Sequence, residues 1–132
     1  MSGRLLGVDW GERRIGLALT DETRTIARPL ATLTRRAGKR FPMQQLLAHH
    51  AVVGLPLDAA GGEGAAARSA RTLAAEIARR AGLPVELWDE RLTTARALRT
   101  VRELGGSTRG RKDDVDALAA ALLLQHYLDA RR

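Results

Sequence analysis

The sequence predicts an α/β fold with five strands, and two observations lead to this prediction. Apolar stretches of strand length follow one another at the start of the chain, whereas later ones alternate with helical patterns. A chain of 132 residues, of which 45% are hydrophobic, has the usual size of one domain and can close one core. We therefore expect a single domain that spans residues 1–132.

The first part of the chain contains three candidate strands in succession. Arg4–Val8 and Arg14–Thr20 are apolar runs, and the Gly-containing stretch Trp10–Arg13 between them fits a tight turn that joins antiparallel strands. Thr25–Thr34 alternates polar and apolar residues, and its Pro29 indicates an edge position or a break. Three consecutive strands should therefore open the fold.

The rest of the chain alternates between helical and strand-like patterns. His50–Leu55 contains a β-branched pair and indicates a buried strand, and Val85–Trp88 is typical of another. Helices are expected at four segments with helical periodicity or a capping residue, which are Gln44–His49, Ala65–Ala81, Thr93–Leu104 and Asp113–Leu128. Gly82 should end the second of these helices, and the basic, glycine-rich stretch Gly105–Lys112 should form a loop.

The composition favours a polyanionic partner and excludes several kinds of site. Lys and Arg number 22 against 15 Asp and Glu, so the chain carries a formal charge of +7, which suits nucleic acid but also a solvated, arginine-rich surface. The absence of cysteine excludes disulfides, thiolate zinc sites and a cysteine nucleophile. The three histidines have no metal-ligand spacing.

No segment has the length of a membrane span. The longest uninterrupted apolar run, Ala117–Leu124, has eight residues, whereas a spanning helix needs roughly 20. The N-terminus also has too short an apolar run for a signal peptide. We therefore expect a cytoplasmic protein without membrane contact.

Acidic residues occur where an uncompensated charge would be costly. Asp9 directly follows the apolar run LLGV, so its carboxylate requires a partner. It could cap the next turn by accepting backbone hydrogen bonds, or it could bind a ligand, and both explain its position equally well. Asp113 and Asp116 lie on one face of the last expected helix and could reach one cation. Asp113 could equally stabilise the helix start. Asp116 should point towards the sheet, because it continues an apolar stripe of Ala119, Ala120, Leu123 and Tyr127.

The third acidic segment is the pair that follows VELW. Strand alternation lets only one of Asp89 and Glu90 face the same side of the sheet as the other acids, and the residues do not decide which. Neutralisation by Arg91 and solvent is the alternative for both. Acids from three segments form an all-oxygen donor set, which suits a pair of Mg²⁺ or Mn²⁺ ions. Such ions can activate water and stabilise a leaving oxygen, as phosphodiester hydrolysis requires.

Four motifs together resemble the YqgF or RuvX family of bacteria, whose members are described as Holliday-junction resolvases or pre-16S ribosomal RNA nucleases. In chain order they are GVDWGERRIGLALTD at 7–21, VVGLPLDAAGGEG at 52–64, LWDERLTTARA at 87–97 and KDDVDALAAALLLQHYLD at 112–129. Each motif is weak alone, but the ordered combination covers nearly the whole chain and is specific.

The resemblance implies a ribonuclease H-like fold, with a mixed sheet of three antiparallel strands and then two parallel strands, flanked by helices. It implies a metal-dependent nuclease with Asp9, Glu90 and Asp116 as catalytic and metal-binding residues. Asp113 matches a further metal-binding carboxylate, and the pattern favours Glu90 over Asp89. Family members often have GLPLNMDGSEG where this chain has GLPLDAAGGEG, so a role for the side chains of that loop is open.

Several other groups near the expected site have two interpretations. The basic residues could hold phosphates or form structural ion pairs, and they are Arg13, Arg14, Arg91, Arg111 and Lys112. Trp10 could stack on a base or pack in the core. The glycines of residues 61–64 could offer amides to a phosphate or form a solvent-exposed loop.

Three functions stay open at this point. The resemblance favours 5′-end processing of pre-16S ribosomal RNA in ribosome biogenesis. A Holliday-junction resolvase acting on four-way DNA is the main alternative, and its symmetric cuts would favour a homodimer over a monomer. A non-catalytic nucleic-acid-binding assembly factor is the third.

Sugar kinases and actin-like ATPases also begin with a strand, a DxG motif and a second strand, but they bind nucleotide between two such domains.

Overall fold

A mixed five-stranded sheet forms the centre of the molecule. In this computed structural model, residues 3–11, 14–34, 50–58, 60–90 and 112–131 are described, apart from the side chains of residues 112–114. The strands are β1 (Leu5–Trp10), β2 (Arg14–Thr20), β3 (Ala27–Thr34), β4 (His50–Leu55) and β5 (Val85–Asp89), and their order is β3-β2-β1-β4-β5. β1 and β3 pair antiparallel with β2, whereas β4 pairs parallel with β1 and β5. The expected arrangement of strands is confirmed.

Strand boundaries differ from the expected ones by one or two residues in β1, β3 and β5, which ends at Asp89 rather than Trp88. β1 continues through Trp10 rather than ending at Val8, because its ladder with β2 extends to the pair Trp10 and Ile15. β3 begins at Ala27 rather than Thr25, and it has the expected edge position. Pro29 is tolerated there, next to an irregularity in the ladder, because an edge strand has one side without ladder hydrogen bonds.

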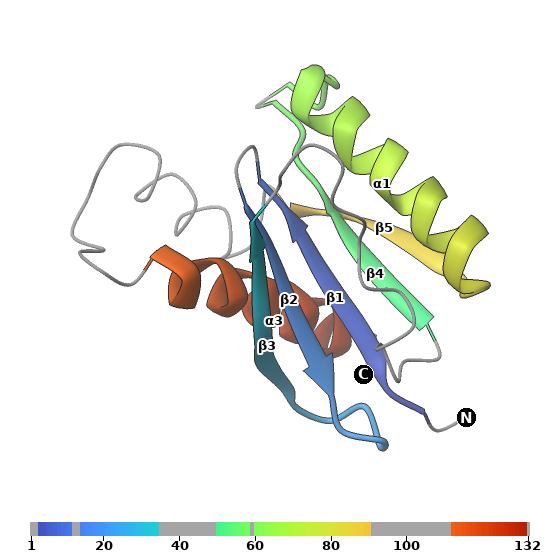
Figure 1. Cartoon of the computed structure of the whole chain (residues 1–132), viewed down its shortest axis with the longest axis vertical. Coiled ribbons are helices and arrows are strands. Elements are labelled where there is room, and N and C mark those ends of the chain that lie inside the picture. Colours follow the sequence, from blue (N-terminus) through green and yellow to red (C-terminus); the bar gives the residue numbers. More distant parts are fainter. Residues whose placement is uncertain (1–2, 12–13, 35–49, 59, 91–111, 132) are drawn as a thin grey trace.

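Two helices cover opposite faces of the sheet (Figure 1). α1 (Ala65–Ala81) packs over β1, β4 and β5, and α3 (Lys112–Ala130) packs over β1, β2 and β3. α1 ends at Gly82, as expected, where a left-handed backbone (φ 68°) lets the Gly82 amide donate to the Ala78 carbonyl. α3 extends slightly beyond both expected ends, since it includes Lys112 and Ala130. The expected helices at 44–49 and 93–104 lie outside the described residues.

Strand alternation divides the core into two layers. Leu6, Val8 and Val53 pack with the α1 side, whereas Leu5 and Val52 pack with the α3 side. The expected apolar stripe of α3 is confirmed, because its four members, Ala119, Ala120, Leu123 and Tyr127, are all buried. No helix within the described ranges has the length and apolar character needed to cross a membrane.

Candidate active site

Asp9 lies inside β1, with its side chain on the face that α3 covers. Residues on either side of it fix this direction: Val8 belongs to the α1 layer, and a Cβ on Gly7 would meet Leu124 of α3. Alternation therefore turns Asp9 towards α3. Only 2% of Asp9 is exposed to solvent, although it is an acid.

Asp116 enters the same place from α3. A Cβ on Gly16 would lie 1.9 Å from the carbonyl oxygen of Asp116, so the helix backbone rests directly on this strand. Gly16 is the ladder partner of Asp9, and opposite residues of antiparallel strands face the same side, about 4.5–5.5 Å apart at Cβ. Asp116 is fully buried. Asp9 and Asp116 are therefore neighbours beneath α3.

Glu90 is the third buried acid, and it follows the last residue of β5. Its Oε2 would lie 2.6 Å from a Cβ on Gly54, where Leu123 of α3 is the next neighbour at 2.9 Å. Gly54 faces α3 because Val53, one position earlier, packs on the α1 side. Glu90 is 1% exposed, whereas Asp89 is only partly buried. The structure therefore places Glu90, rather than Asp89, with the other two acids.

The three acids lie at one end of the sheet, where β1, β4 and β5 have their carboxyl ends. This is the place at which parallel strands of open α/β sheets usually present functional groups. Even so, among the residues described, no three acidic or histidine side chains are gathered closely enough to form a ready-made metal site. The side chain of Asp113, the further expected ligand, lies outside the described part.

Arg14 compensates the charge of Asp116. Its Nε donates a hydrogen bond to Oδ2 of Asp116 at 2.8 Å, and the two side chains are 22% and 0% exposed. Arg14 precedes Gly16 by two positions in β2, so its side chain leaves the strand on the α3 face. A buried carboxylate is costly unless a cation or hydrogen-bond donors accompany it. For Arg14, the structural ion pair is the interpretation that the structure supports.

The other basic residues proposed to hold phosphates are not placed by the structure. Arg13, Arg91 and Arg111 lie outside the described residues, as does the side chain of Lys112. Trp10 is 8% exposed and packs in the core on the α1 side, so packing rather than base stacking describes its environment.

The glycine-rich segment before α1 is an ordered turn built on Asp58. Oδ1 of Asp58 accepts hydrogen bonds from the amides of Ala60 at 2.9 Å and Gly62 at 2.7 Å, and the Gly61 amide donates to the Asp58 carbonyl. These amides are therefore already engaged, which argues against their use for a phosphate. Asp58, where the chain departs from the family pattern, has a structural role here.

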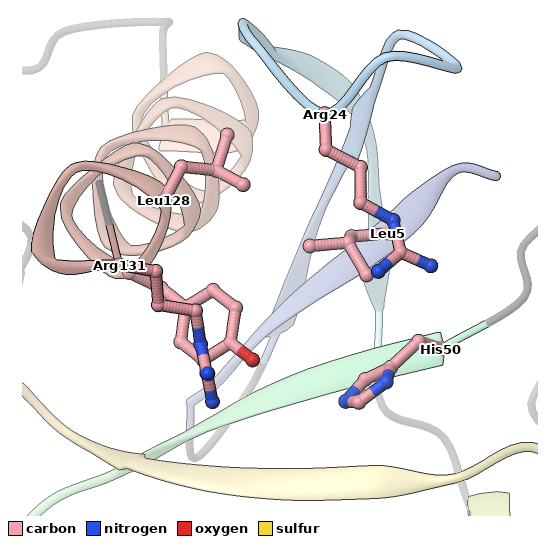
Figure 2. Close-up of a pocket in the computed structure, with 6 residues that line it drawn as sticks. Leu5, Arg24, His50, Leu128 and Arg131 are labelled. Carbon is pink, nitrogen blue, oxygen red and sulfur yellow. The ribbon is translucent and has the colours of Figure 1, made fainter. Parts of the chain in front are cut away.

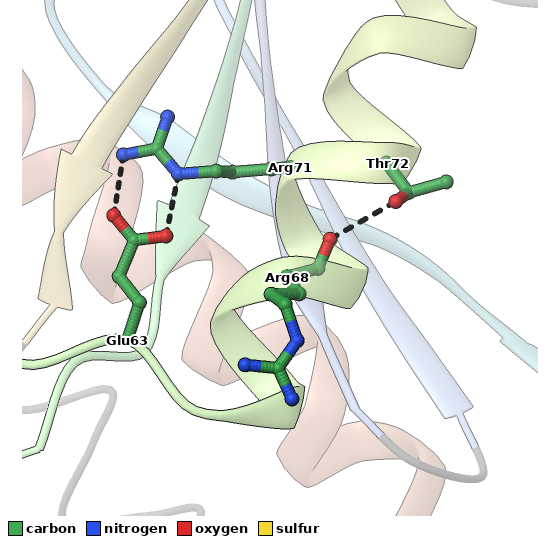
Figure 3. A network of polar contacts seen from close by, with 4 residues as sticks. All are labelled: Glu63, Arg68, Arg71 and Thr72. Carbon is green, nitrogen blue, oxygen red and sulfur yellow. Dashed lines mark hydrogen bonds and ion pairs between the residues drawn. The ribbon is translucent and has the colours of Figure 1, made fainter.

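An ion pair attaches the end of this segment to α1. Arg71 donates two hydrogen bonds to the carboxylate of Glu63, at 2.6 and 2.7 Å, and Thr72 donates to the carbonyl of Arg68 within the helix (Figure 3). Both members of the pair are exposed enough that it contributes little stability. It links Glu63, which lies just before α1, to the second turn of that helix.

Three glycines that the sequence motifs did not single out as functional shape the site. Gly7, Gly16 and Gly54 lie in three neighbouring strands on the α3 face, and each is a position where a Cβ would overlap α3 or Glu90. An isolated glycine inside a strand pattern is a known sign of close backbone approach. That signal was present in the sequence at all three positions.

Comparisons with known proteins show which family the chain resembles. The family model described as "RuvX: Holliday junction resolvase" matches residues 3–130. A protein of Anaeromyxobacter sp. (strain Fw109-5) is 48% identical over 97% of this chain and 98% of its own length. One of Paramagnetospirillum magneticum is 43% identical over 97% and 86%. Both are named "Putative pre-16S rRNA nuclease".

A solved structure has the same fold. It is T. thermophilus RuvC in complex with a Holliday junction substrate, with a TM-score of 0.51 and 19% identity over 97% of this chain and 95% of that one. RuvC has a ribonuclease H-like fold, so the expected fold class is confirmed. At this identity the likeness concerns the fold alone.

Proposed function

The chain belongs to the RuvX family of nucleases, and from this premise we propose that it cleaves ribosomal RNA precursors in a metal-dependent reaction at Asp9, Glu90 and Asp116. The proposed reaction is hydrolysis of a phosphodiester bond during maturation of the 5′ end of pre-16S ribosomal RNA. The proposed compartment is the cytoplasm, because bacterial ribosomal RNA is made there. We propose that residues 1–132 act as one nuclease domain, as a monomer or homodimer.

The observation that carries the proposal is the burial of three carboxyl groups on one face of the sheet. Asp9, Glu90 and Asp116 are 2%, 1% and 0% exposed, and they come from β1, the end of β5 and α3. Burying one carboxylate is costly, and burying three on one face of the sheet is more so, because like charges repel. In a member of a nuclease family, such buried acids are the ligands that a divalent cation would need.

The donor set fits a hard divalent cation. All candidate ligands are carboxylate oxygens, which Mg²⁺ and Mn²⁺ prefer, and the chain has no cysteine to favour a softer metal. We propose Asp9, Glu90 and Asp116 as the ligands of a pair of these ions, with Asp113 as a fourth. When bound, the ions would acidify a water molecule and neutralise charge on the leaving oxygen.

The chain's own residues would supply position and charge. Gly16 lets the backbone of Asp116 lie against β2, and Gly54 leaves room for the carboxylate of Glu90 beside β4. Arg14 keeps the Asp116 carboxylate paired in this structure, and ligation would require Asp116 to share or leave that contact. We propose that Arg13, Arg91, Arg111 and Lys112 contact phosphates of the substrate, which the excess of basic residues favours.

Cleavage of four-way DNA junctions is the second candidate. The description of the family model favours it, whereas the names of the two relatives favour ribosomal RNA. We prefer RNA because those relatives are 48% and 43% identical to this chain. The third candidate, a non-catalytic assembly factor, would bind nucleic acid without cutting it.

A cleavage assay on three substrates separates these candidates. A 5′-extended 16S RNA fragment, an unrelated single-stranded RNA and a four-way DNA junction would be incubated with Mn²⁺, with Mg²⁺ or with EDTA. We expect cleavage of the precursor fragment with a divalent ion and none in EDTA. Junction cleavage without RNA cleavage would favour the resolvase, and binding without any cleavage would favour the assembly factor.

Charge-removing variants test the residues. We expect Asp9→Asn, Glu90→Gln and Asp116→Asn each to lower cleavage by at least about a hundredfold while the protein stays folded and bound to nucleic acid. Glu76→Gln, on α1 at the opposite face of the sheet, is the matched control and should cleave normally. Undiminished cleavage in all three site variants would remove these acids from the mechanism.

A further inference from the structure

A concave region lies at the other end of the sheet from the buried acids. It has a volume of about 330 Å³ and is lined by Leu5, Arg24, His50, Tyr127, Leu128 and Arg131. Leu5 and His50 begin β1 and β4, whereas Asp9 and Gly54 lie near the ends of those strands. Along α3, Arg131 is 15 residues beyond Asp116, or roughly 22 Å at 1.5 Å per residue. The pocket is therefore separate from the candidate active site.

Among the described residues, the lining of this pocket offers cations and hydrogen-bond donors but no carboxylate. Figure 2 shows the side chains of Arg24, His50 and Arg131 reaching towards one space from three directions, with Leu5 and Leu128 beside them. The nearby acid Glu86 is engaged by Arg131 Nη2, at 2.6 and 2.7 Å, and by the hydroxyl of Tyr127. Glu86 therefore offsets the charge of Arg131, and Arg24 leaves the pocket positive.

Arg24 is held in place by an unusual backbone. It is the non-glycine residue with positive φ (58°) among those described, a conformation that L-residues rarely adopt. Asp21 stabilises the turn, because its Oδ1 accepts hydrogen bonds from the amides of Thr25 and Ile26 and its carbonyl accepts one from the Arg24 amide. The Nε of Arg24 then donates to the carbonyl of Gly3 at 2.6 Å. Strain of this kind tends to occur where a side chain has a function.

His50 also lines this pocket. Its Nε2 is buried and has no hydrogen-bond partner within the described part of the chain. Burial lowers the pKa of His50 below 6.5, and Arg24 and Arg131 lower it further, against the opposite effect of Glu86. The imidazole is therefore neutral near pH 7. A buried polar atom of this kind is satisfied when a ligand supplies its partner.

We propose that this pocket binds a phosphomonoester, with the phosphate between Arg24 and His50 and within reach of Arg131. The guanidinium groups of arginine match the oxygens of a phosphate, and the charge of the nearby Glu86 is compensated by Arg131. Leu5 and Leu128 would contact the sugar or base of a nucleotide. The volume is at the small end for ligand sites, so it suits one terminal group rather than a duplex.

The same chemistry has two sources, a free mononucleotide and the 5′-phosphate of an RNA strand. Binding would be measured by calorimetry in EDTA at fixed salt, so that divalent ions cannot recruit phosphate to the buried acids. The probes are adenosine 5′-monophosphate, adenosine, and one short oligoribonucleotide with either a 5′-phosphate or a 5′-hydroxyl. We expect each phosphorylated probe to bind more tightly than its unphosphorylated counterpart. Preference for the phosphate in only one pair identifies that source.

A variant pair assigns the binding to the pocket. Arg24→Asn removes the guanidinium, and asparagine is among the residues that best tolerate positive φ. We expect it to weaken binding of the phosphorylated probe by about tenfold, since charge-assisted hydrogen bonds to phosphate are lost. Arg79→Gln, an exposed arginine of α1 with the same change in net charge, should change binding less than about twofold.

A measurement on the unmodified chain keeps the proposal testable if Arg24→Asn does not fold. A phosphate beside His50 should raise the pKa of its imidazole, which faces Arg24, Arg131 and Glu86, and an NMR titration with and without adenosine 5′-monophosphate would show the change. The proposal is overturned if phosphate gives no advantage in either pair of probes, or if His50 titrates identically with and without the nucleotide. The result does not depend on whether the buried acids cleave RNA.

Discussion

Removal of the Arg14 guanidinium tests how the buried charge of Asp116 is compensated. Arg14→Met keeps most of the aliphatic stem and removes the cation. Breaking a buried ion pair from one side costs about 3–5 kcal/mol, because the remaining charge stays buried. Asp116 is fully buried, but Arg14 is 22% exposed, so solvent should replace part of the lost interaction. We expect a loss of roughly 2–4 kcal/mol of unfolding free energy.

Urea denaturation in EDTA would measure this loss. The variants Arg14→Met, Asp116→Asn and the combination of the two form a double-mutant cycle, which isolates the energy of the pair from other effects of each change. We expect a coupling energy of about 1–3 kcal/mol. The control is Arg71→Met, which removes an arginine from an exposed ion pair and should cost less than about 1 kcal/mol.

Adding Mn²⁺ then relates the ion pair to the proposed metal site. If Asp116 is a ligand, the ion supplies the positive charge that Arg14→Met removed, so this variant should regain stability. The gain would be about 2.7 kcal/mol when the free ion concentration is a hundred times the dissociation constant. Asp116→Asn should gain much less.

Two results would refute this reasoning. A loss below about 1 kcal/mol for Arg14→Met would mean that the pair behaves like one on the surface. An equal gain from Mn²⁺ in Arg14→Met and Asp116→Asn would mean that the ion binds elsewhere.

Two further predictions concern the supports of the site and of the turn after β2. The methyl group of Gly16→Ala would overlap the backbone of Asp116, so we expect urea denaturation to show a loss of about 3 kcal/mol of unfolding free energy. The control is Gly64→Ala, whose new atom has nothing within 4 Å and which should lose less than about 1 kcal/mol. Equal losses would contradict the close approach of α3. Hydrogen bonds from the Thr23 hydroxyl and two backbone amides lower the pKa of Asp21 from 3.8 to about 2. The folded state therefore binds fewer protons than the unfolded state between these values, so this stabilisation is present above pH 4 and is lost as the pH falls towards 2. A carbon-13 NMR titration should give Asp21 a pKa near 2 in the unmodified chain and a higher pKa in Thr23→Val. If the pKa of Asp21 is unchanged in that variant, the Thr23 hydrogen bond is not the main cause of the lowered pKa.

The sequence predicted the elements well where a periodic pattern decided the outcome. α1 has the expected bounds because its apolar residues follow the helical period, and β4 has them because its β-branched pair lies in a short, continuous apolar run. β1 was expected to end at Val8, since Asp9 and Gly11 are common in turns. The ladder nevertheless continues to Trp10, which the α1-side core buries. Tertiary packing therefore outweighed the local preference for a turn.

The candidate site was predictable in its residues but not in its contacts. The inward direction of Asp116 followed from its apolar stripe, and the structure agrees. Alternation could not choose between Asp89 and Glu90, because the sequence does not show which face Trp88 occupies. In the structure Trp88 packs on the α3 side, and Glu90, two positions later, lies on the same face. The partner of Arg14 is 102 positions away, so no local pattern could distinguish an ion pair from a phosphate contact.

The site also depends on side chains that are absent. Gly16 lets the backbone of α3 rest on β2, and Gly54 leaves room for the carboxylate of Glu90 above β4. Any larger residue at either position would push an acid away from Asp9, although neither glycine has chemistry of its own. A search of the sequence for reactive groups therefore finds the acids and misses what brings them together. Where one helix covers a face of a sheet, glycines that share that face in adjacent strands indicate where the helix comes closest. The acids nearest to these glycines are the first to test for a role in catalysis.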